Sequence, residues 1–385
     1  MKFNLSKTVL NLPPSGIRVF FDIVLGMKDV VSLGVGEPDF PTPWHIRETA
    51  IHSIEAGDTS YTSNMGYFAL RRVLGKHLKQ KFSLTYNPDK EILITVGVSE
   101  AMDLVMRAIL NPGDKVLMVE PHYVSYPAVV TLAGGIPVAI KTKKENSFKL
   151  KPTDIEKYVD KKTKAILLNY PCNPTGTSYS KAELIALAKI INKHDLLVIS
   201  DEIYDMLSYN YKHTMFATLP GMKKRTIYLN GFSKGYAMTG FRIGYACGPE
   251  QIIDAMNRIH QYTILCAPIT GQKAAIEALE HGEKEALKMA KEYNRRRRFV
   301  VNRLNEIGLN CHVPEGAFYA FPSIENTKYS SMEFSMQLLE KEKVAVVPGT
   351  AFGESCEGFI RISYASSMEN LQEAMLRIEH FLKKN

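Results

Sequence analysis

The chain has 385 residues, 45% of them hydrophobic and 23% charged, a composition that excludes disordered, collagenous and coiled-coil architectures. Its 48 Lys and Arg outnumber 40 Asp and Glu, and the resulting net charge of +8 raises the question of a nucleic-acid partner. No apolar run approaches the roughly 18–20 residues of a membrane span. The N-terminal segment also lacks the apolar core of a secretory signal. We therefore expect a cytoplasmic protein with no membrane association.

Short apolar runs alternate with amphipathic segments from about residue 90 onward. The predicted strands are 92–96, 116–119, 137–140, 165–169, 196–200, 226–229 and 243–246, and the predicted helices between them are 99–110, 128–133, 153–159 and 181–194. Such alternation is typical of a mostly parallel sheet with helices on both faces. The sequence therefore predicts an α/β fold.

The pattern changes after about residue 266. Two long helices are predicted at 269–281 and 285–307, followed by strands at 318–321, 344–347 and 359–363 and a last helix at 368–382. This arrangement predicts a smaller α+β domain. We expect an N-terminal arm that also contributes to the small domain (1–40), a large cofactor-binding domain (41–285) and the small C-terminal domain (286–385).

Four consecutive arginines, Arg295 to Arg298, form the densest basic cluster and lie within a predicted helix. Adjacent residues point to different sides of a helix, so at most two of them can share a face. No aromatic residues interleave them, as they would on a nucleic-acid-binding platform. We expect a solvated helix surface, or one that pairs with acidic residues, and no nucleic-acid partner.

Polar residues follow the predicted strands of the large domain. Strand 196–200 leads into Asp201, strand 165–169 leads into Asn173, and strand 226–229 leads into Lys234. The carboxyl ends of strands in an open α/β sheet border the usual ligand crevice. Lys234 by itself could be a surface cation or a phosphate ligand, and Asp201 could be an ordinary strand-end acid.

Together, Lys234 and Asp201 fit the requirements of pyridoxal phosphate, which needs a lysine for its aldehyde and an acid beside its pyridinium nitrogen. A carboxylate at hydrogen-bond distance keeps that nitrogen protonated. Tyr204 and Asn173 could reach the oxygen on the cofactor ring. The segment 97–99 opens a predicted helix, where backbone N–H groups, including that of Val98, and the hydroxyl of Ser99 would bind a phosphate.

These residues resemble the class I, fold-type I pyridoxal-phosphate aminotransferases, and among them the prokaryotic aspartate/aromatic branch. The motifs stand in family order along nearly the whole chain: GEPDF at 36–40, Tyr61, NPTG at 173–176, DEIY at 201–204, SK at 233–234, GFRIG at 240–244 and RIS at 361–363. Any one of them occurs easily by chance, whereas seven in order and at similar spacing are specific.

The resemblance implies that Lys234 binds the cofactor's aldehyde and later carries the proton of the substrate. It also implies that Asp201 binds the pyridinium nitrogen, that Tyr204 and Asn173 bind the ring oxygen, and that Tyr123 stacks on the ring. The phosphate ligands would be Ser99, Ser233 and Arg242. Arg361 would bind the substrate α-carboxylate, and Gly36 would lie on the loop that covers this carboxylate. Asn173 and Tyr123 would also border the substrate. Tyr61 would reach the phosphate of the other subunit in a homodimer.

Two departures from the family pattern matter, the first for specificity and the second for a hydroxyl that would bind the phosphate. Aspartate-specific members usually have Trp where this chain has Tyr123, and the single tryptophan, Trp44, is expected to serve packing. Many eukaryotic members have Ser where this chain has Gly231. No residue is assured of binding a side-chain carboxylate, so we expect aromatic or broad-range amino donors with a 2-oxo acid such as 2-oxoglutarate. The alternatives are an aspartate-preferring aminotransferase and a C–S lyase of the same fold.

Other kinds of site have weaker support. Gly34 and Gly36 begin a dinucleotide-like motif, but Asp39 stands at the next required glycine. There is no HExxH motif, and the five cysteines show no metal-ligand spacing, so we expect reduced thiols and no metal. Glu202 and Asp205, which could suggest a metal cluster with Asp201, are expected to be solvated or capping.

Overall fold

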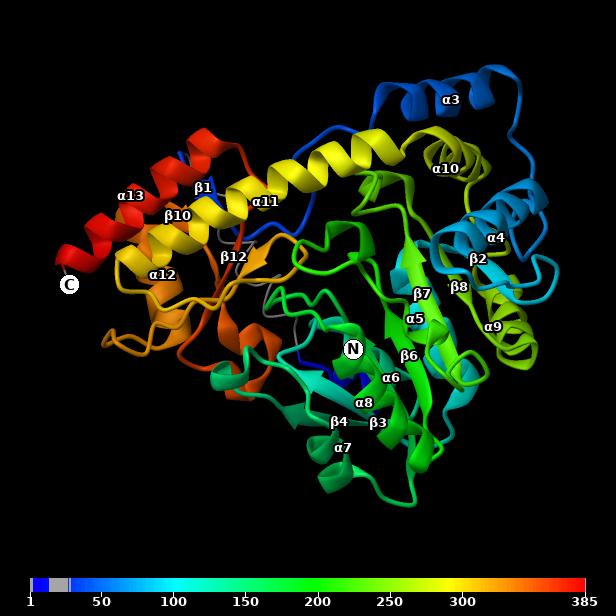
Figure 1. Cartoon of the computed structure of the whole chain (residues 1–385), viewed down its shortest axis with the longest axis horizontal. Coiled ribbons are helices and arrows are strands. Elements are labelled where there is room, and N and C mark those ends of the chain that lie inside the picture. The colour runs from blue at the N-terminus through cyan, green and yellow to red at the C-terminus, as the bar shows by residue number, and fades with distance from the viewer. Residues whose placement is uncertain (1–2, 14–26, 28, 385) are drawn as a thin grey trace.

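The computed structural model, which describes residues 3–13, 27 and 29–384, is built around a seven-stranded sheet (Figure 1). Its strands follow the order β2-β8-β7-β6-β5-β3-β4, and β8 runs antiparallel to both of its neighbours. The strands are β2 (Ile92–Val96), β3 (Lys115–Glu120), β4 (Ile136–Lys141), β5 (Thr163–Asn169), β6 (Leu197–Asp201), β7 (Thr226–Gly231) and β8 (Ile243–Cys247). The mostly parallel order confirms the α/β prediction.

Helices cover both faces of this sheet because its central strands are apolar on both sides. On one face, α5 (Gly97–Ile109), α6 (Ser125–Leu132) and α9 (Glu250–Thr263) share a buried core with the strands. On the other face are α7 (Pro152–Tyr158) and α8 (Lys181–Lys193). At the β2–β8 side, α3 (Trp44–Glu55) and α4 (Phe68–Phe82) pack against α10 (Ile269–His281).

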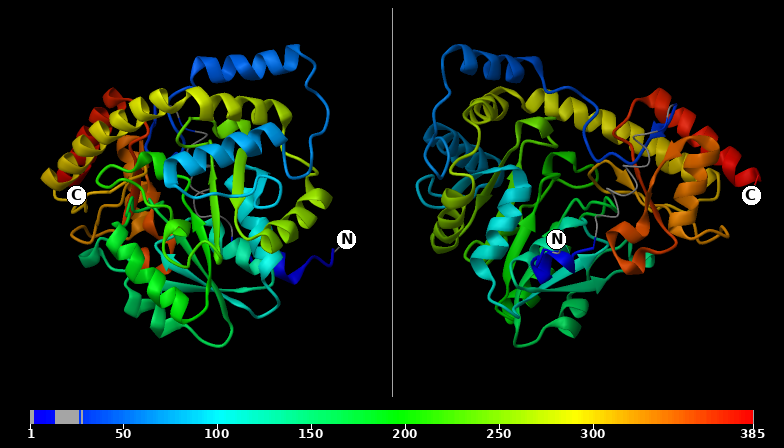
Figure 2. Two further views of the ribbon diagram at one scale, coloured as in Figure 1. Left: turned by 45° about the vertical axis from the view of Figure 1, so that its right-hand side comes forward. Right: turned by 180° about the vertical axis from the view of Figure 1, so that it is seen from behind.

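The C-terminal region is joined to this part by the long helix α11 (Glu283–Glu306), which Figures 1 and 2 show extending from α10 to a position beside α13 (Met368–Lys384). A small antiparallel sheet contains β11 (Val347–Pro348), β12 (Ile360–Ser363) and β9 (Tyr319–Ala320). Next to it, β1 (Val31–Ser32) pairs in parallel with β10 (Val344–Ala345), and α12 (Ser331–Glu342) packs against β10. Residues 31–32 are thereby tied to the C-terminal region.

The shorter elements complete the described part of the chain. They are α1 (Lys7–Leu10) and the 3₁₀ helices η1 (Lys144–Asn146), η2 (Asp205–Leu207), η3 (Phe216–Thr218), η4 (Thr239–Phe241), η5 (Gly349–Phe352) and η6 (Glu354–Cys356). No described helix combines the length and the apolar character needed to cross a membrane.

Several expectations need correction. The strand predicted at 344–347 is divided at Val346, because its two halves pair with different partners, β1 and β12. Helices α3, α4, α9 and α12 were not predicted. Trp44 was expected to serve packing, but it is 57% exposed, and the Arg47 guanidinium lies 5.1 Å from its ring centre.

Candidate active site

A pocket of about 740 Å³ lies at the carboxyl ends of the central strands and extends to the C-terminal sheet. It brings together eleven of the twelve residues that the sequence pointed to: Gly36, Val98, Ser99, Tyr123, Asn173, Asp201, Tyr204, Ser233, Lys234, Arg242 and Arg361. Tyr61, the twelfth, does not line this pocket and is 82% exposed. Tyr126 and Tyr319 also line the pocket, and sequence reasoning missed both.

Lys234 follows strand β7, and its Nζ donates a hydrogen bond of 2.6 Å to the carbonyl oxygen of Gly36. Burial lowers the pKa of Lys234 to about 8, and the positive charges of Arg361 and Arg242 act in the same direction, whereas Glu37 opposes them. At pH 7 roughly a tenth of the side chain is therefore neutral amine, the form that attacks a carbonyl carbon.

Asp201 is the last residue of β6 and is buried beneath the pocket. Its carboxylate accepts hydrogen bonds from the Tyr126 hydroxyl at 2.7 Å and from the Ile203 backbone N–H at 3.2 Å. Burial raises the pKa of Asp201 to about 6, although the Tyr126 hydrogen bond acts against that rise. A cation placed beside this carboxylate would keep it ionised, so the position suits a protonated ring nitrogen.

Glycines bring two chain segments, 97–99 and 242–244, close together at an anion-binding corner. A Cβ on Gly244 would lie 2.5 Å from the carbonyl carbon of Gly97 and 2.6 Å from the Val98 nitrogen. A Cβ on Gly97 would lie 2.6 Å from the Arg242 guanidinium. The guanidinium therefore reaches the N-terminus of α5, where Ser99 adds a hydroxyl. Backbone N–H groups and a guanidinium are the donors that phosphate prefers.

The opposite side of the pocket is built around Arg361, which projects from β12 and is 2% exposed. Its Nη1 donates to Asn173 Oδ1 at 2.8 Å and its Nη2 to the Gly34 carbonyl oxygen at 2.5 Å. The guanidinium lies 4.6 Å from the ring centre of Tyr319. Its Nε is buried without a hydrogen-bond partner among the described residues. A planar fork with spare donor capacity suits a carboxylate ligand.

Tyr319 connects the two sides of the pocket. Its hydroxyl lies 2.9 Å from that of Tyr204, and a Cβ on Gly36 would lie 2.5 Å from the same Tyr319 oxygen. Position 36 therefore has no room for a side chain unless this tyrosine moves.

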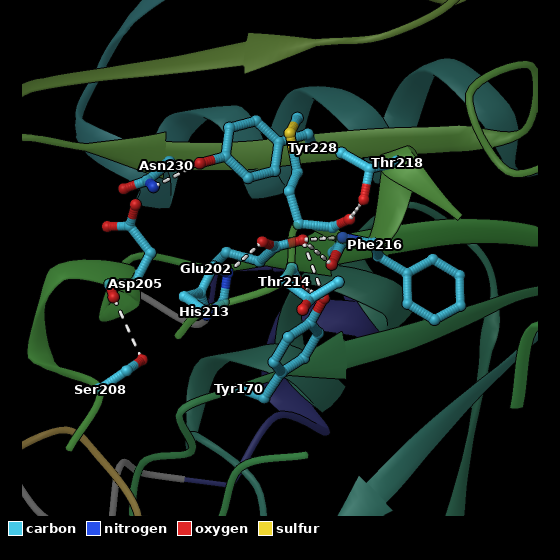
Figure 3. Close-up of polar contacts among 12 residues, drawn as sticks. Tyr170, Glu202, Asp205, Ser208, His213, Thr214, Phe216, Thr218, Tyr228 and Asn230 are labelled. Carbon is cyan, nitrogen blue, oxygen red and sulfur yellow. Dashed lines mark hydrogen bonds and ion pairs between the residues drawn. The ribbon is translucent and has the colours of Figure 1, made fainter. Parts of the chain in front are cut away.

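Glu202 and Asp205 are buried, which corrects the expectation that they are solvated or capping. Figure 3 shows Glu202 among polar groups that include His213 and Tyr170. His213 Nε2 lies 2.5 Å from Glu202 Oε2, and the Ser200 hydroxyl donates to Oε1 at 2.6 Å. Asp205 pairs with Lys81 at 2.7 Å. Side chains alternate between the faces of a strand, so Glu202 leaves the sheet on the side away from Asp201. No cluster suited to a metal ion occurs in residues 3–13, 27 and 29–384.

The donor set fits pyridoxal phosphate. A buried lysine with a lowered pKa, a buried acid and a cradle of backbone N–H groups and a guanidinium meet in one pocket. The cradle depends on close backbone approaches that any side chain on Gly244 would prevent. These are the three groups that this cofactor requires.

The comparison with known families agrees with this geometry. Residues 28–378 match the family model of aminotransferase class I and II. The chain belongs to this family of pyridoxal-phosphate-dependent enzymes, and it is an aminotransferase, as the sequence motifs indicated.

Individual relatives are similar over nearly the full chain. YugH of Bacillus subtilis, whose name assigns it provisionally to the aminotransferases, is 53% identical over 380 residues, which cover 99% of this chain and 98% of the relative. An aspartate aminotransferase of Pyrococcus abyssi is 47% identical, with 96% of each chain covered. The crystal structure of an aromatic aminotransferase from Pyrococcus horikoshii superposes with a TM-score of 0.91 at 43% identity, covering 95% of this chain and 99% of that one.

Proposed function

We propose that this aminotransferase takes the amino group from aromatic and other apolar L-amino acids and passes it to a 2-oxo acid such as 2-oxoglutarate. One observation carries the proposal. The basic residues lining the pocket are Lys234, Arg242 and Arg361, and each has a task in binding the cofactor or the α-carboxylate. No further cation among the described pocket residues is left to bind a side-chain carboxylate.

The residues on the sheet side would hold pyridoxal phosphate, which, when bound, accepts the electrons of the substrate's Cα–H bond into its ring. Lys234 would bind the aldehyde, and as a neutral amine it would accept the Cα proton of the donor and later supply a proton to the cofactor carbon that receives the amino group. Asp201 would keep the ring nitrogen protonated. The phosphate would be bound by the Val98 N–H, Ser99, Ser233 and Arg242. Tyr204 and Asn173 would bind the ring oxygen, and Tyr123 would stack on the ring.

The residues on the other side would hold the substrate. Arg361 presents two or more N–H groups to the α-carboxylate, which every donor and acceptor shares. Gly36 lies on the segment that covers this carboxylate, and Asn173 and Tyr123 border the substrate. Because one arginine serves all substrates, discrimination falls to the apolar side-chain region, where one methylene is worth only about 1–3 kcal/mol.

We propose that the active form is a homodimer in which Tyr61 reaches the phosphate of the partner's cofactor. Tyr61 is 82% exposed and Tyr262 is 86% exposed, so two large aromatic side chains lie uncovered in the isolated chain. The continuous helix α11 would join a large domain (41–285) to a small one (286–385), with residues 1–40 contributing an arm. Fully active monomers in a sedimentation-controlled assay would refute the dimer.

A panel of donors tests the specificity. The measurement is kcat/KM for tyrosine, phenylalanine, kynurenine and aspartate with 2-oxoglutarate, and we expect the aromatic donors to equal or exceed aspartate. The name of the Pyrococcus abyssi relative favours the other candidate, an aspartate-preferring enzyme. An advantage of about a hundredfold for aspartate exceeds what an apolar pocket provides and would reveal a further cation, for example from the partner subunit. Pyruvate and ammonia formed without an acceptor would indicate a lyase.

A further inference from the structure

The four consecutive arginines of α11 divide into exposed and buried side chains. Arg295 and Arg298 are exposed, whereas Arg296 and Arg297 are each 6% exposed. Arg297 donates to the Pro314 carbonyl oxygen and to Asn210, so it is neither solvated nor paired with an acid, contrary to expectation. Arg296 contacts the segment that crosses the active site.

Arg296 holds both residues at the end of the GEPDF motif. Its Nη1 lies 2.8 Å from each carboxylate oxygen of Asp39, to which the Tyr293 hydroxyl also donates at 3.2 Å. Its guanidinium lies 5.1 Å from the ring centre of Phe40 and 5.6 Å from that of Tyr293. Cation, carboxylate and two aromatic rings thus fix the segment to α11.

The same segment forms the substrate side of the pocket. The Gly34 carbonyl accepts from Arg361, and the Gly36 carbonyl accepts from Lys234. Upstream, the Leu33 carbonyl accepts from the Ser363 N–H of β12 at 2.7 Å. The segment is therefore attached at one end to the C-terminal sheet and at the other to α11, whose 24 residues span about 36 Å (Figure 1).

We propose that Arg296 is a positioning residue for substrate binding, an inference that rests on the proposed function. By holding Asp39 and Phe40 against α11, it keeps the stretch from Gly34 to Gly36 over the substrate's α-carboxylate. Glycines have the largest backbone freedom, and a mobile loop must be ordered when the ligand binds. Loss of the attachment therefore weakens substrate binding, while the groups that move the proton stay in place.

The matched test compares Arg296→Gln with Arg295→Gln. Both arginines bind Glu292, at 3.0 Å and 2.8 Å respectively, and each substitution removes one positive charge, but only Arg296 reaches Asp39. With tyrosine and 2-oxoglutarate as substrates, Arg296→Gln should raise both KM values roughly tenfold and leave kcat within about threefold of the unaltered enzyme. This pattern is expected when a variant loses binding energy that the ground state and the transition state share. Arg295→Gln should change neither. Asp39→Asn should match Arg296→Gln, and the double variant should add little because the two share one contact.

Hydrogen exchange supplies a readout that does not depend on turnover. Amides of residues 34–40 should exchange faster in Arg296→Gln than in Arg295→Gln, with and without cofactor. Equal KM changes in the two variants, a fall in kcat at unchanged KM, or unaltered exchange would overturn the proposal. If Arg296→Gln does not fold, Asp39→Asn replaces it in the comparison with Arg295→Gln, because this substitution removes the other partner of the ion pair. Failure of the unaltered enzyme to transaminate would refute the proposed function, whereas the exchange experiment would still test the attachment.

Discussion

The two sides of the pocket are built in different ways. The cofactor side consists of loops that each follow a strand of one sheet: Asp201 ends β6 and Lys234 follows β7. The substrate side joins segments far apart in the chain, because Arg361 contacts Gly34, 327 positions away. The geometry of the cofactor side depends on a single sheet. The geometry of the substrate side depends on the contacts between the C-terminal region and residues 33–40.

This difference assigns the tasks. In the proposed function, groups on the cofactor side would adjust charge and proton transfer, so changes there should alter rates. Groups on the substrate side would position a carboxylate, so changes there should alter affinity. The predictions below test that division.

The largest effect is expected for Lys234→Ala, which removes the carrier of the Cα proton. Turnover should fall by about 10⁴-fold, the upper range for general acid–base catalysis, while the phosphate cradle still binds the cofactor. Borohydride should fix the cofactor on Lys234 of the unaltered enzyme. The exposed Lys224 serves as the control, since Lys224→Ala should retain full turnover. Near-normal rates in Lys234→Ala would refute the role.

Asp201→Asn should have the next largest effect, because it keeps the shape and removes the charge that stabilises the pyridinium. Because the ring nitrogen loses its charged partner, proton removal should slow by roughly a hundredfold, which corresponds to about 2.7 kcal/mol of barrier. Single-turnover absorbance measurements report this rate. Asp195→Asn, at a side chain 91% exposed, is the matched control. An unchanged rate of proton removal in Asp201→Asn would show that Asp201 is only a structural residue at the end of a strand.

Arg361→Lys should weaken all donors and acceptors together, since an ammonium cannot reproduce the bidentate fork. Loss of a charged hydrogen bond costs about 1.5–3 kcal/mol, so kcat/KM should fall by one to two orders of magnitude. Arg258→Lys, at a side chain 74% exposed, should be silent. Selective loss of one donor would contradict the assignment of the α-carboxylate to Arg361.

A smaller effect concerns pH. Burial lowers the pKa of Lys234 to about 8, so the reactive neutral amine increases as the pH rises toward 8. Cofactor capture by the unloaded protein should accelerate about tenfold per pH unit below pH 8 and level off above it. Stopped-flow absorbance gives the profile. A rise that continues to pH 10 would show that the amine titrates like an exposed lysine.

The sequence located most residues that line the sheet side of the pocket, because strand ends can be read locally. Asp201, Lys234 and Arg242 stand beside apolar runs that form buried strands. Tyr319 lies in the predicted strand 318–321 but was missed as a site residue, because no local pattern links it to Gly36. The Arg296–Asp39 pair spans 257 positions and was equally inaccessible. Glu202 is buried against His213 and the Phe216 N–H, which belong to a loop. The hydrophobic pattern of the sequence does not predict the path of that loop.

The most direct test measures the tyrosine half-reaction in Asp201→Asn and Arg361→Lys side by side. Single-turnover absorbance at increasing tyrosine concentration gives a maximal rate constant and an apparent dissociation constant for each variant. We predict that Asp201→Asn lowers the rate constant with little change in the dissociation constant, and that Arg361→Lys mainly raises the dissociation constant. Both variants losing rate and affinity in the same proportion would contradict the division of the pocket into a cofactor side and a substrate side.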